Sequence, residues 1–179
     1  QVGLVGSEMC IRDRLISLRD KISNFQDLKT HSKEINDVEK KFTLFNSQLI
    51  NEVIRDTNEN IDLIGFHGQT IFHDPINKSS IQLCDEQKIK SSFKLSIVSD
   101  FRQKDLSLGG QGAPLTPIFH KLLMLESKMT PPVCFINIGG ISNITVIDNQ
   151  KYIYAYDTGP GMCLLDQYMI LKKKINFDK

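Results

Sequence analysis

The sequence predicts an α/β fold in which a mixed sheet is flanked by helices. Two observations indicate this fold. Long segments carry apolar residues at helical spacing, and short apolar runs rich in branched residues lie between them. Helices and strands therefore interleave along the chain, as in α/β folds, and a hairpin near the end of the chain makes the sheet mixed.

Three helices are expected. The apolar residues of segment 35–53 recur at alternating steps of three and four residues, which places them on one stripe of a long amphipathic helix. A second helix follows Pro114 and Pro117, because proline is tolerated in the first helical turn, and Pro131 stops it. A closing helix is expected over residues 164–171.

Strands are expected where compact apolar runs lie between polar segments. They cover residues 61–66, 81–83, 95–98, 133–138, 144–147 and 152–156. The sequence contains no internal repeat and no low-complexity tract. Residues 1–14 show no sustained period, and we treat them as a non-homologous or artefactual N-terminal segment outside the fold prediction.

Composition sets limits on size and on partners. With 179 residues, 40% hydrophobic and 24% charged, the chain can bury one substantial core and forms one domain or part of a larger one. Twenty-two Lys and Arg offset twenty-one Asp and Glu. No net field therefore attracts nucleic acid or an anionic membrane, so we expect neither as a partner. Partners must be inferred from local sites.

The location of the protein is expected to be the cytoplasm. No apolar run approaches the roughly 18 residues of a membrane span, and no secretory signal stands at the N-terminus. The four cysteines are widely spaced and form no CxxC pair, which is typical of small buried thiols in a reducing compartment.

Polar and glycine-bearing segments follow several of the predicted strands. They are residues 67–70, 100–102, 109–112, 139–143 and 157–161. In open α/β sheets, ligands bind in the crevice beyond the carboxyl ends of the strands. We therefore expect these segments to share one site.

Gly139 and Gly140 form a tip where backbone amides can approach an anion closely, because no Cβ stands in the way. Phosphate is the anion that we expect to bind there. The alternative is an ordinary turn whose glycines serve only a positive φ, and for an isolated pair that alternative would be favoured. The chain contains no GxxxxGK[ST] motif, and no GxGxxG follows a strand.

Residues 157–161 are predicted to connect a strand to a helix, so their amides and the helix start are candidates to hold a second phosphate group. The alternative is a simple turn in which Asp157 or Thr158 caps the helix.

Asp100 follows a predicted strand, where its carboxylate would project into the crevice and could take a proton from a hydroxyl or a water molecule. A structural ion pair with Arg102, or a cap, is the alternative. His67 and His73 have no metal-binding spacing, and His120 is expected to be an ordinary, partly buried helix residue.

Together these segments resemble the anhydro-N-acetylmuramic acid kinase family, in the large group that includes actin, the Hsp70 chaperones and hexokinase. The matching stretches are residues 61–70 with His73 and Pro75, 98–102, 109–115, 137–143 and 157–161, in the family's order. The resemblance covers about residues 15–170. It implies a ribonuclease-H-like fold of two lobes with ATP in the cleft.

The resemblance also implies a reaction. The γ-phosphate of ATP passes to the 6-hydroxyl oxygen of 1,6-anhydro-N-acetylmuramic acid while water opens the anhydro ring. The product is N-acetylmuramic acid 6-phosphate, in the recycling of cell-wall peptidoglycan. Magnesium would neutralise phosphate charge, as at other phosphoryl-transfer sites. Its ligands stay unassigned, and a homodimer is possible.

The resemblance assigns roles to residues of this chain. Asp100 is the general base that activates the attacking water. The sugar is expected to contact His67, Gln69, Thr70, Arg102, Gly110 and Gln111. Phosphate and nucleotide are expected at Asn137, Gly139, Gly140, Asp157, Thr158 and Gly159.

The chain also departs from the family pattern. Residues 1–14 do not resemble the family's first phosphate loop, so residues 15–179 are expected to be a partial kinase domain, incomplete at both ends and inactive alone. Phe72, Cys84 and Met162 replace residues that the family prefers. Two alternatives remain open: a fragment without function, and a non-catalytic module that binds a nucleotide or a sugar.

Overall fold

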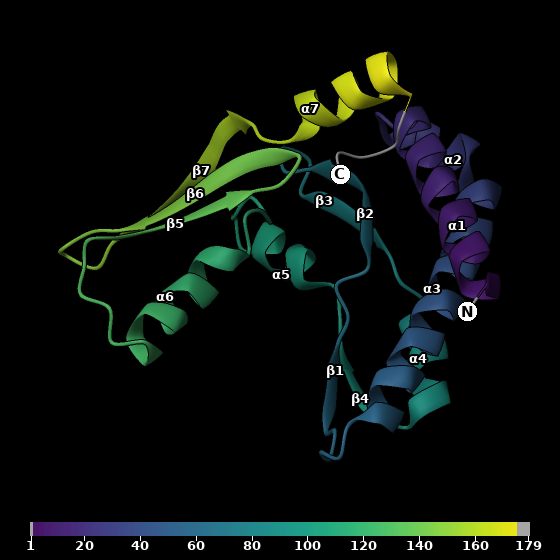
Figure 1. Ribbon diagram of the computed structural model, residues 1–179, viewed down its shortest axis with the longest axis horizontal. Coiled ribbons are helices and arrows are strands. Elements are labelled where there is room, and N and C mark those ends of the chain that lie inside the picture. The colour runs from purple at the N-terminus through teal and green to yellow at the C-terminus, as the bar shows by residue number, and fades with distance from the viewer. Residues whose placement is uncertain (1, 175–179) are drawn as a thin grey trace. The chain divides into compact units, whose positions relative to one another are not determined.

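The computed structural model describes the backbone of residues 2–174 and the side chains of residues 11–172 and 174 (Figure 1). The chain divides into two compact units, Gln1–Ala113 and Pro114–Lys179. The first unit contains α1 (Val2–Lys21), α2 (Phe25–Thr30), α3 (Ser32–Asp56), β1 (Leu63–Gly65), β2 (Gln69–Asp74), β3 (Ser79–Leu83), α4 (Glu86–Phe93), β4 (Ser96–Val98) and α5 (Phe101–Ser107).

The second unit contains α6 (Thr116–Glu126), β5 (Val133–Ile138), β6 (Ile141–Ile147), β7 (Ile153–Pro160), α7 (Cys163–Tyr168) and a π-helical turn (Met169–Lys173). Every strand and helix that the sequence predicts has a counterpart. Within the described residues, no helix is long and apolar enough to cross a membrane.

The core of the first unit lies where α1 and α3 pack against the hairpin of β2 and β3. Its buried residues are Leu18, Ile22, Val38, Ile71, Phe72 and Leu83. The predicted amphipathic helix is confirmed as α3. Its predicted stripe is buried at Val38 and half-buried at Phe42 and Phe45, whereas Val53 is exposed. The backbone of α1 is helical from Val2 onward, so part of the segment without a sequence period belongs to a helix.

The α/β class is confirmed. Among the described residues the strands are distributed over three small sheets, each wholly parallel or wholly antiparallel, where the sequence predicts one mixed sheet. β1 and β4 pair in parallel, β2 and β3 are antiparallel, and β5, β6 and β7 form an antiparallel sheet in that order. Parallel strands need a long crossover connection. Here the hairpin of β2 and β3 and helix α4 supply it.

Strand β2 was missed by the sequence prediction, which treated residues 67–70 as a loop. A bulge explains the miss, because the register passes from Thr70 opposite Gln82 directly to Phe72 opposite Ile81. Ile71 is the extra residue, and both Ile71 and Phe72 are buried. The alternation of apolar and polar residues that identifies a strand is therefore broken in its middle.

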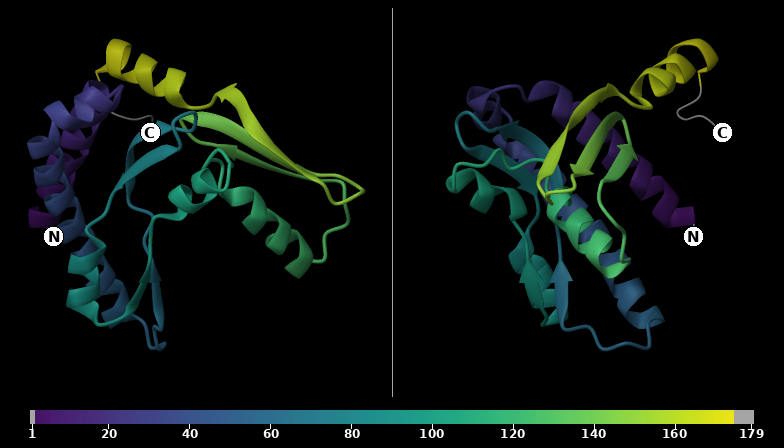
Figure 2. Two further views of the ribbon diagram at one scale, coloured as in Figure 1. Left: turned by 180° about the vertical axis from the view of Figure 1, so that it is seen from behind. Right: turned by 90° about the vertical axis from the view of Figure 1, so that its left-hand side faces the viewer.

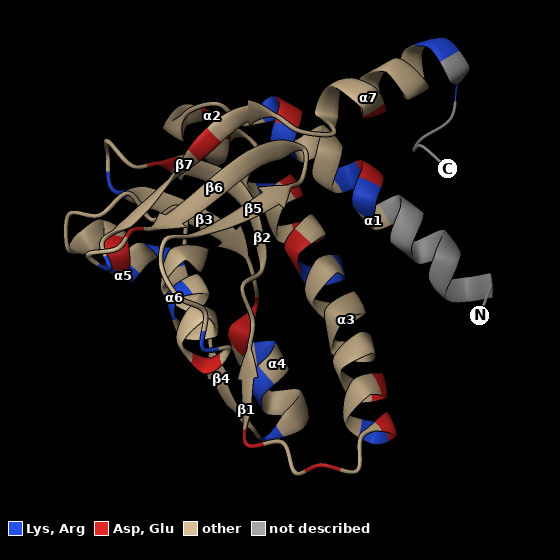
Figure 3. Ribbon diagram, turned by 60° about the vertical axis from the view of Figure 1, so that its left-hand side comes forward, with Lys and Arg blue, Asp and Glu red and all other residues tan. Residues whose placement is uncertain are grey.

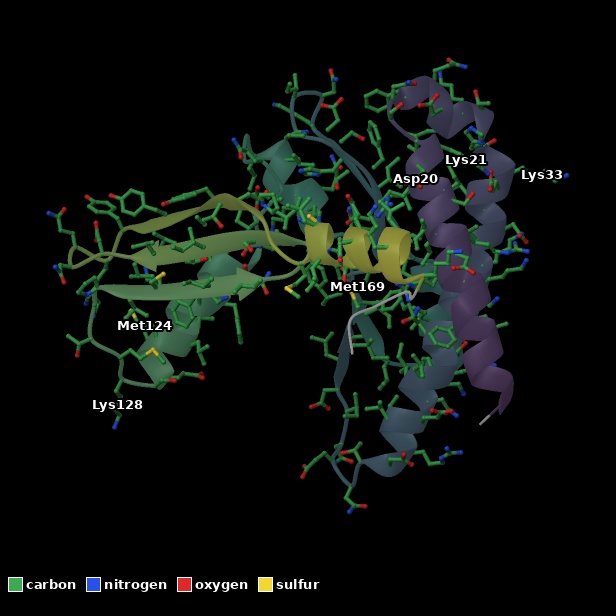
Figure 4. All side chains as sticks on the ribbon, turned by 45° about the horizontal axis from the view of Figure 1, so that its top comes forward. Asp20, Lys21, Lys33, Met124, Lys128 and Met169 are labelled. Carbon is green, nitrogen blue, oxygen red and sulfur yellow. The ribbon has the colours of Figure 1, made fainter. Side chains whose placement is uncertain are left out.

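In the second unit, α6 lies along one face of the sheet of β5, β6 and β7 (Figure 2). Met124 of α6, labelled in Figure 4, is 1% exposed. His120 Nδ1 lies 2.9 Å from Thr145 Oγ1, and its ring stacks on Phe135 at 4.6 Å between centroids. His120 is thus partly buried, as predicted.

Candidate functional site

Arg102 joins three of the polar segments that the sequence analysis singled out. Its Nε donates a hydrogen bond of 3.1 Å to Nε2 of His67, in the loop after β1. Its Nη1 donates one of 2.7 Å to the carbonyl oxygen of Gly112, in the loop after α5. The guanidinium therefore holds both loops beside the start of α5. The sequence also predicts that the polar segments of the second unit belong to the same site, and this stays a prediction.

The two contacts of His67 define its tautomer. Its Nδ1 lies 2.8 Å from the carbonyl oxygen of Gly68, and a carbonyl can only accept. Nδ1 therefore carries the proton and Nε2 accepts from Arg102. The ring also stacks on Phe101, with 7° between the planes. Burial lowers the pKa of Arg102 from its ordinary value, which is so high that the group stays charged.

Asp100 stands between β4 and α5 in a left-handed backbone conformation, with φ of 55°. Its carboxylate caps no helix amide, and among the described residues it has neither an ion pair with Arg102 nor a hydrogen bond. Both structural alternatives from the sequence are therefore wrong. A non-glycine residue in this region carries strain of order 1 kcal/mol, and such strain gathers at functional sites.

An open pocket of about 300 Å³ brings Asp100 and His67 together. Its wall also includes Ser80 and Gln82 of β3, and Cys84 and Glu86 near the start of α4. Asp100 is exposed and lies at this pocket, as its position at a strand end predicts. Gln82 was missed, because in the sequence it is an ordinary polar residue of an alternating strand.

Two side chains of helix α3 hold the turn between β3 and α4 by hydrogen bonds. The amide of Cys84 donates to Oε1 of Glu39 at 3.0 Å, and the amide of Asp85 donates to Oγ1 of Thr43 at 3.1 Å. Burial, with the nearby carboxylates of Glu86, Glu39 and Asp85, raises the pKa of the Cys84 thiol to about 11. The thiol in the pocket is therefore neutral near pH 7.

Gln69 and Thr70 lie within β2 and not in a loop as expected. Gln69 is exposed, and its Nε2 donates to the carbonyl oxygen of Thr70 at 3.3 Å. Thr70 Oγ1 accepts a hydrogen bond of 3.2 Å from Nε2 of Gln82 on the paired strand. Thr70 is thus linked to the pocket through Gln82.

The loop that contains Gly110 and Gln111 folds around Asp105 of α5. The carboxylate of Asp105 accepts from the amide of Gly112 at 2.7 Å, and its carbonyl accepts from the amide of Gly110 at 2.9 Å. A Cβ on Gly110 would collide with the Asp105 carboxylate. Local packing therefore requires the glycine. Gln111 is exposed, and its side chain has no hydrogen-bond partner among the described residues.

Gly139 and Gly140 form the tip between β5 and β6, and neither has a positive φ of the left-handed kind. A Cβ on either would find its nearest atom at 3.6 Å or more, which is ordinary contact. The interpretation that these glycines serve a positive φ is therefore wrong. Among the described residues, neither a positive φ nor a close contact requires glycine at the tip.

The carbonyl oxygens of this tip are used by the chain itself. The amides of Gly161 and Cys163 donate to Gly140 at 2.9 and 3.2 Å, and the amide of Met162 donates to Gly139 at 2.8 Å. Amides at this helix start were candidates in the sequence to hold a second phosphate group. These three amides do not fit that role, because each already has a partner within the chain.

Asp157, Thr158 and Gly159 belong to strand β7 and not to a strand-to-helix loop as predicted. Thr158 is the extra residue of a bulge, because Ser142 faces Gly159 and Asn143 faces Asp157. The Thr158 hydroxyl donates to the carbonyl of Ser142 at 3.1 Å. Neither Asp157 nor Thr158 caps α7, so the capping alternative is also wrong.

Asn137, Asn143 and Asp157 stand directly opposite one another on three neighbouring strands. Residues paired in this way project to the same face of a sheet, so they form one polar row. Asp157 is the sole charged residue of β5, β6 and β7, which Figure 3 shows almost wholly in tan. Asn143 was missed, because its pairing with both neighbours cannot be read from the sequence.

No group of three or more His, Cys, Asp or Glu side chains that could hold a metal ion occurs among the described residues. The polar row nevertheless suits a cation that keeps most of its water. Magnesium is commonly held by one or two carboxylates together with phosphate oxygens and water molecules. One carboxylate with two amide side chains fits that mode of binding.

The mixed α/β fold is consistent with the sugar-kinase superfamily. A family model described as anhydro-N-acetylmuramic acid kinase matches residues 13–179, so the chain belongs to the anhydro-N-acetylmuramic acid kinase family.

Individual relatives agree with this family. The chain is 43% identical over 171 residues to an anhydro-N-acetylmuramic acid kinase of Pelagibacter ubique (strain HTCC1062), a match of 94% of this chain and 46% of the relative. It is 40% identical over 121 residues to the protein of that name from Nitrobacter winogradskyi, covering 68% of this chain and 33% of the relative. The chain thus spans about half, or less, of the curated relatives it matches.

Proposed function

We propose that the full-length protein that contains this chain is a kinase that uses ATP to phosphorylate 1,6-anhydro-N-acetylmuramic acid and opens its anhydro ring with water. The product would be N-acetylmuramic acid 6-phosphate, released for cell-wall recycling in the cytoplasm, where ATP is available. The observation that carries the proposal is the exposed carboxylate of Asp100, without a partner among the described residues, at a pocket shared with His67. The names of the relatives support the substrate.

Asp100 is the proposed general base. Its carboxylate takes a proton from water, the water oxygen bonds to C1 of the sugar, and the bond from C1 to O6 breaks. The freed O6 takes the γ-phosphoryl group of ATP, and ADP leaves. Because no described residue gives it an ion pair or a hydrogen bond, the carboxylate keeps its lone pairs available for that proton.

Arg102 and His67 are proposed to orient the sugar. Hydrogen bonds fix the positions of both side chains, and His67 also stacks on Phe101, so little freedom is lost when a ligand binds. Gln69, Thr70, Gly110 and Gln111 lie on the two segments beside them and are proposed to complete the sugar site.

Gly139 and Gly140 are proposed to let a phosphate group of ATP approach the backbone. A glycine needed neither for conformation nor for packing suggests a cause outside the chain, and close approach of a ligand is such a cause. Asn137 and Asp157, with Thr158 and Gly159, lie beside this tip in the sheet register. Asp157 is the proposed carboxylate near hydrated magnesium, which would neutralise phosphate charge.

The test uses the full-length protein with ATP, magnesium and 1,6-anhydro-N-acetylmuramic acid. We expect a phosphorylated sugar by mass spectrometry, carrying one oxygen from isotopically labelled water. Asp100→Asn should lower turnover by about 100- to 10,000-fold, the range for loss of a general base. The matched control Asp56→Asn, at the exposed end of α3, should keep full turnover.

Three outcomes would count against the proposal. Wild-type protein that makes no phosphorylated sugar rejects the function. Unchanged turnover in Asp100→Asn rejects the base. Tight binding of ATP or sugar without turnover would instead favour a non-catalytic binding module.

A further inference from the structure

The hairpin of β2 and β3 has one apolar face and one polar face. Ile71, Phe72 and Leu83 are buried in the core. Thr70 pairs with Gln82 and His73 pairs with Ser80, and the hydrogen bonds among these four side chains show that they share the other face.

The bulge at Ile71 makes this arrangement possible. Thr70 and His73 are three positions apart, and in a regular strand they would point to opposite faces. The extra residue between Thr70 and Phe72 restores the match with Gln82 and Ser80, which are two positions apart. A polar face of four side chains is the result.

Gln82 is fixed at the centre of this face. Its Nε2 donates to Ser80 Oγ at 2.7 Å and to Thr70 Oγ1 at 3.2 Å. Both hydrogens of the amide are therefore used. Ser80 is 7% exposed, and its hydroxyl also lies 3.1 Å from Nδ1 of His73. The side-chain amide of Gln82 is thus held in one orientation by neighbours that are themselves held.

The side-chain amide oxygen of Gln82 takes no part in these hydrogen bonds. Oε1 has no hydrogen-bond partner among the described residues. Gln82 is half-buried. Among the buried and half-buried residues that the structure describes, every side-chain nitrogen or oxygen atom that solvent cannot reach has a hydrogen-bond partner. Solvent therefore reaches Oε1. Gln82 and Ser80 line the same pocket as Asp100 and His67, so a fixed hydrogen-bond acceptor is available to a ligand there.

We propose that Gln82 is a specificity-determining residue of the sugar site, whose Oε1 accepts a hydrogen bond from an N–H or O–H group of the bound sugar. This inference rests on the proposed function and names a contact within the same pocket. An acceptor that is already oriented loses little entropy on binding. A site built to accept from a donor also rejects analogues without that donor, since the acceptor would be buried without a partner.

The test compares two substitutions in the full-length protein. Gln82→Met keeps the length of the side chain and removes its polar atoms. We expect it to raise the KM for the sugar about tenfold, as for loss of one hydrogen bond of about 1.4 kcal/mol, with the KM for ATP unchanged. Gln87→Met is the control, because Gln87 is exposed on α4 and outside this pocket. It should leave both constants within about twofold.

A second variant guards against loss of folding. Gln82→Glu keeps an acceptor at the same place, and the hydroxyls of Thr70 and Ser80 can turn to donate to it. It should keep the KM for the sugar closer to wild type than Gln82→Met does. Circular dichroism and the thermal unfolding midpoint of each variant establish that the protein is folded.

Sugar analogues identify the donor. If Oε1 accepts from a ring hydroxyl, the penalty of Gln82→Met disappears with the analogue that lacks that hydroxyl, as in a double-mutant cycle. If it accepts from the acetamido N–H, the penalty persists with deoxy analogues and disappears when the acetamido group is absent. A penalty that survives every analogue overturns the proposal.

The failure of this inference differs from the failure of the proposed function. Active wild-type protein whose sugar KM is unaffected by Gln82→Met overturns the role of Gln82 alone. Wild-type protein without turnover counts against the function. Calorimetric titration of the sugar into wild type and Gln82→Met then decides the role of Gln82: weaker binding by the variant supports it, and equal binding or no binding overturns it.

Discussion

The guanidinium Nε of Arg102 donates a hydrogen bond of 3.1 Å to Nε2 of His67, across 35 positions of sequence. The same side chain reaches the carbonyl of Gly112 through Nη1. A planar guanidinium can serve both acceptors at once, whereas the ammonium of lysine is a single point with different geometry. Arg102 therefore links the two loops beside Asp100 to each other.

Arg102→Lys should lower the free energy of unfolding by about 1–3 kcal/mol, because at least one of two half-buried hydrogen bonds is lost. It should also raise the KM for the sugar more than that for ATP. Urea denaturation and steady-state kinetics measure the two effects. Arg55→Lys, at the exposed end of α3, is the control and should change neither. Equal stability of Arg102→Lys and wild type would contradict the prediction.

The proximity of His67 and Asp100 could be predicted from the sequence for a physical reason. Their preceding strands, β1 and β4, are parallel neighbours, with Gly65 opposite Val98. The carboxyl ends of parallel strands lie at one edge, so the loops that follow them meet there. The contribution of Gln82 could not be predicted, since it depends on a bulge and on the orientation of one amide group.

The part of β7 that contains Asp157 could not be predicted from the sequence. Its Gly and Pro residues are typical of loops, and the sequence analysis placed it in one. The structure uses the same residues in a strand, because Gly159, with φ of 140°, completes a bulge and Pro160 ends an edge strand. The composition of a bulged edge strand and that of a turn are alike, and tertiary pairing decides between them.

Gly140→Ala and Gly161→Ala should separate ligand binding from folding. Space for a Cβ exists at Gly140, so the free energy of unfolding should change by no more than about 1 kcal/mol, while affinity for ATP falls. A Cβ on Gly161 would collide with the carbonyl of Gly139 and the hydroxyl of Ser142, so unfolding should become easier by about 1–3 kcal/mol. Denaturant titration and nucleotide binding measure both. Undiminished ATP affinity in Gly140→Ala would reject the phosphate assignment.

The Cys84 thiol should be slow to alkylate. Burial, with Glu86 next, raises its pKa to about 11, and the thiolate is the reactive form. With iodoacetamide at pH 7.5, peptide mass spectrometry should show Cys134, which is exposed, labelled well before Cys84. The rate at Cys84 should keep rising as the pH approaches 11. Glu86→Gln should speed labelling by lowering this pKa, and equal rates at both cysteines would contradict the prediction.

Asp157→Asn should raise the concentration of magnesium needed for half-maximal turnover several-fold. The substitution keeps the shape of the side chain and removes the single charge of the polar row with Asn137 and Asn143. The sugar KM at saturating magnesium should not change. Glu126→Gln, at the exposed end of α6, is the matched control. An unchanged magnesium requirement in Asp157→Asn would place the cation elsewhere.

Thr43→Val should destabilise the first unit through a buried amide. Thr43 is fully buried, and its Oγ1 accepts from the amide of Asp85 at 3.1 Å. Valine has the same shape without the acceptor, so that amide loses its partner, at a cost of about 1–3 kcal/mol. Thr43→Ser keeps the hydroxyl and loses only a methyl group, at a cost of about 1 kcal/mol. Urea denaturation should therefore rank wild type above Thr43→Ser and Thr43→Val last. If Thr43→Val is the more stable of the two variants, the methyl group rather than the hydrogen bond anchors the start of α4.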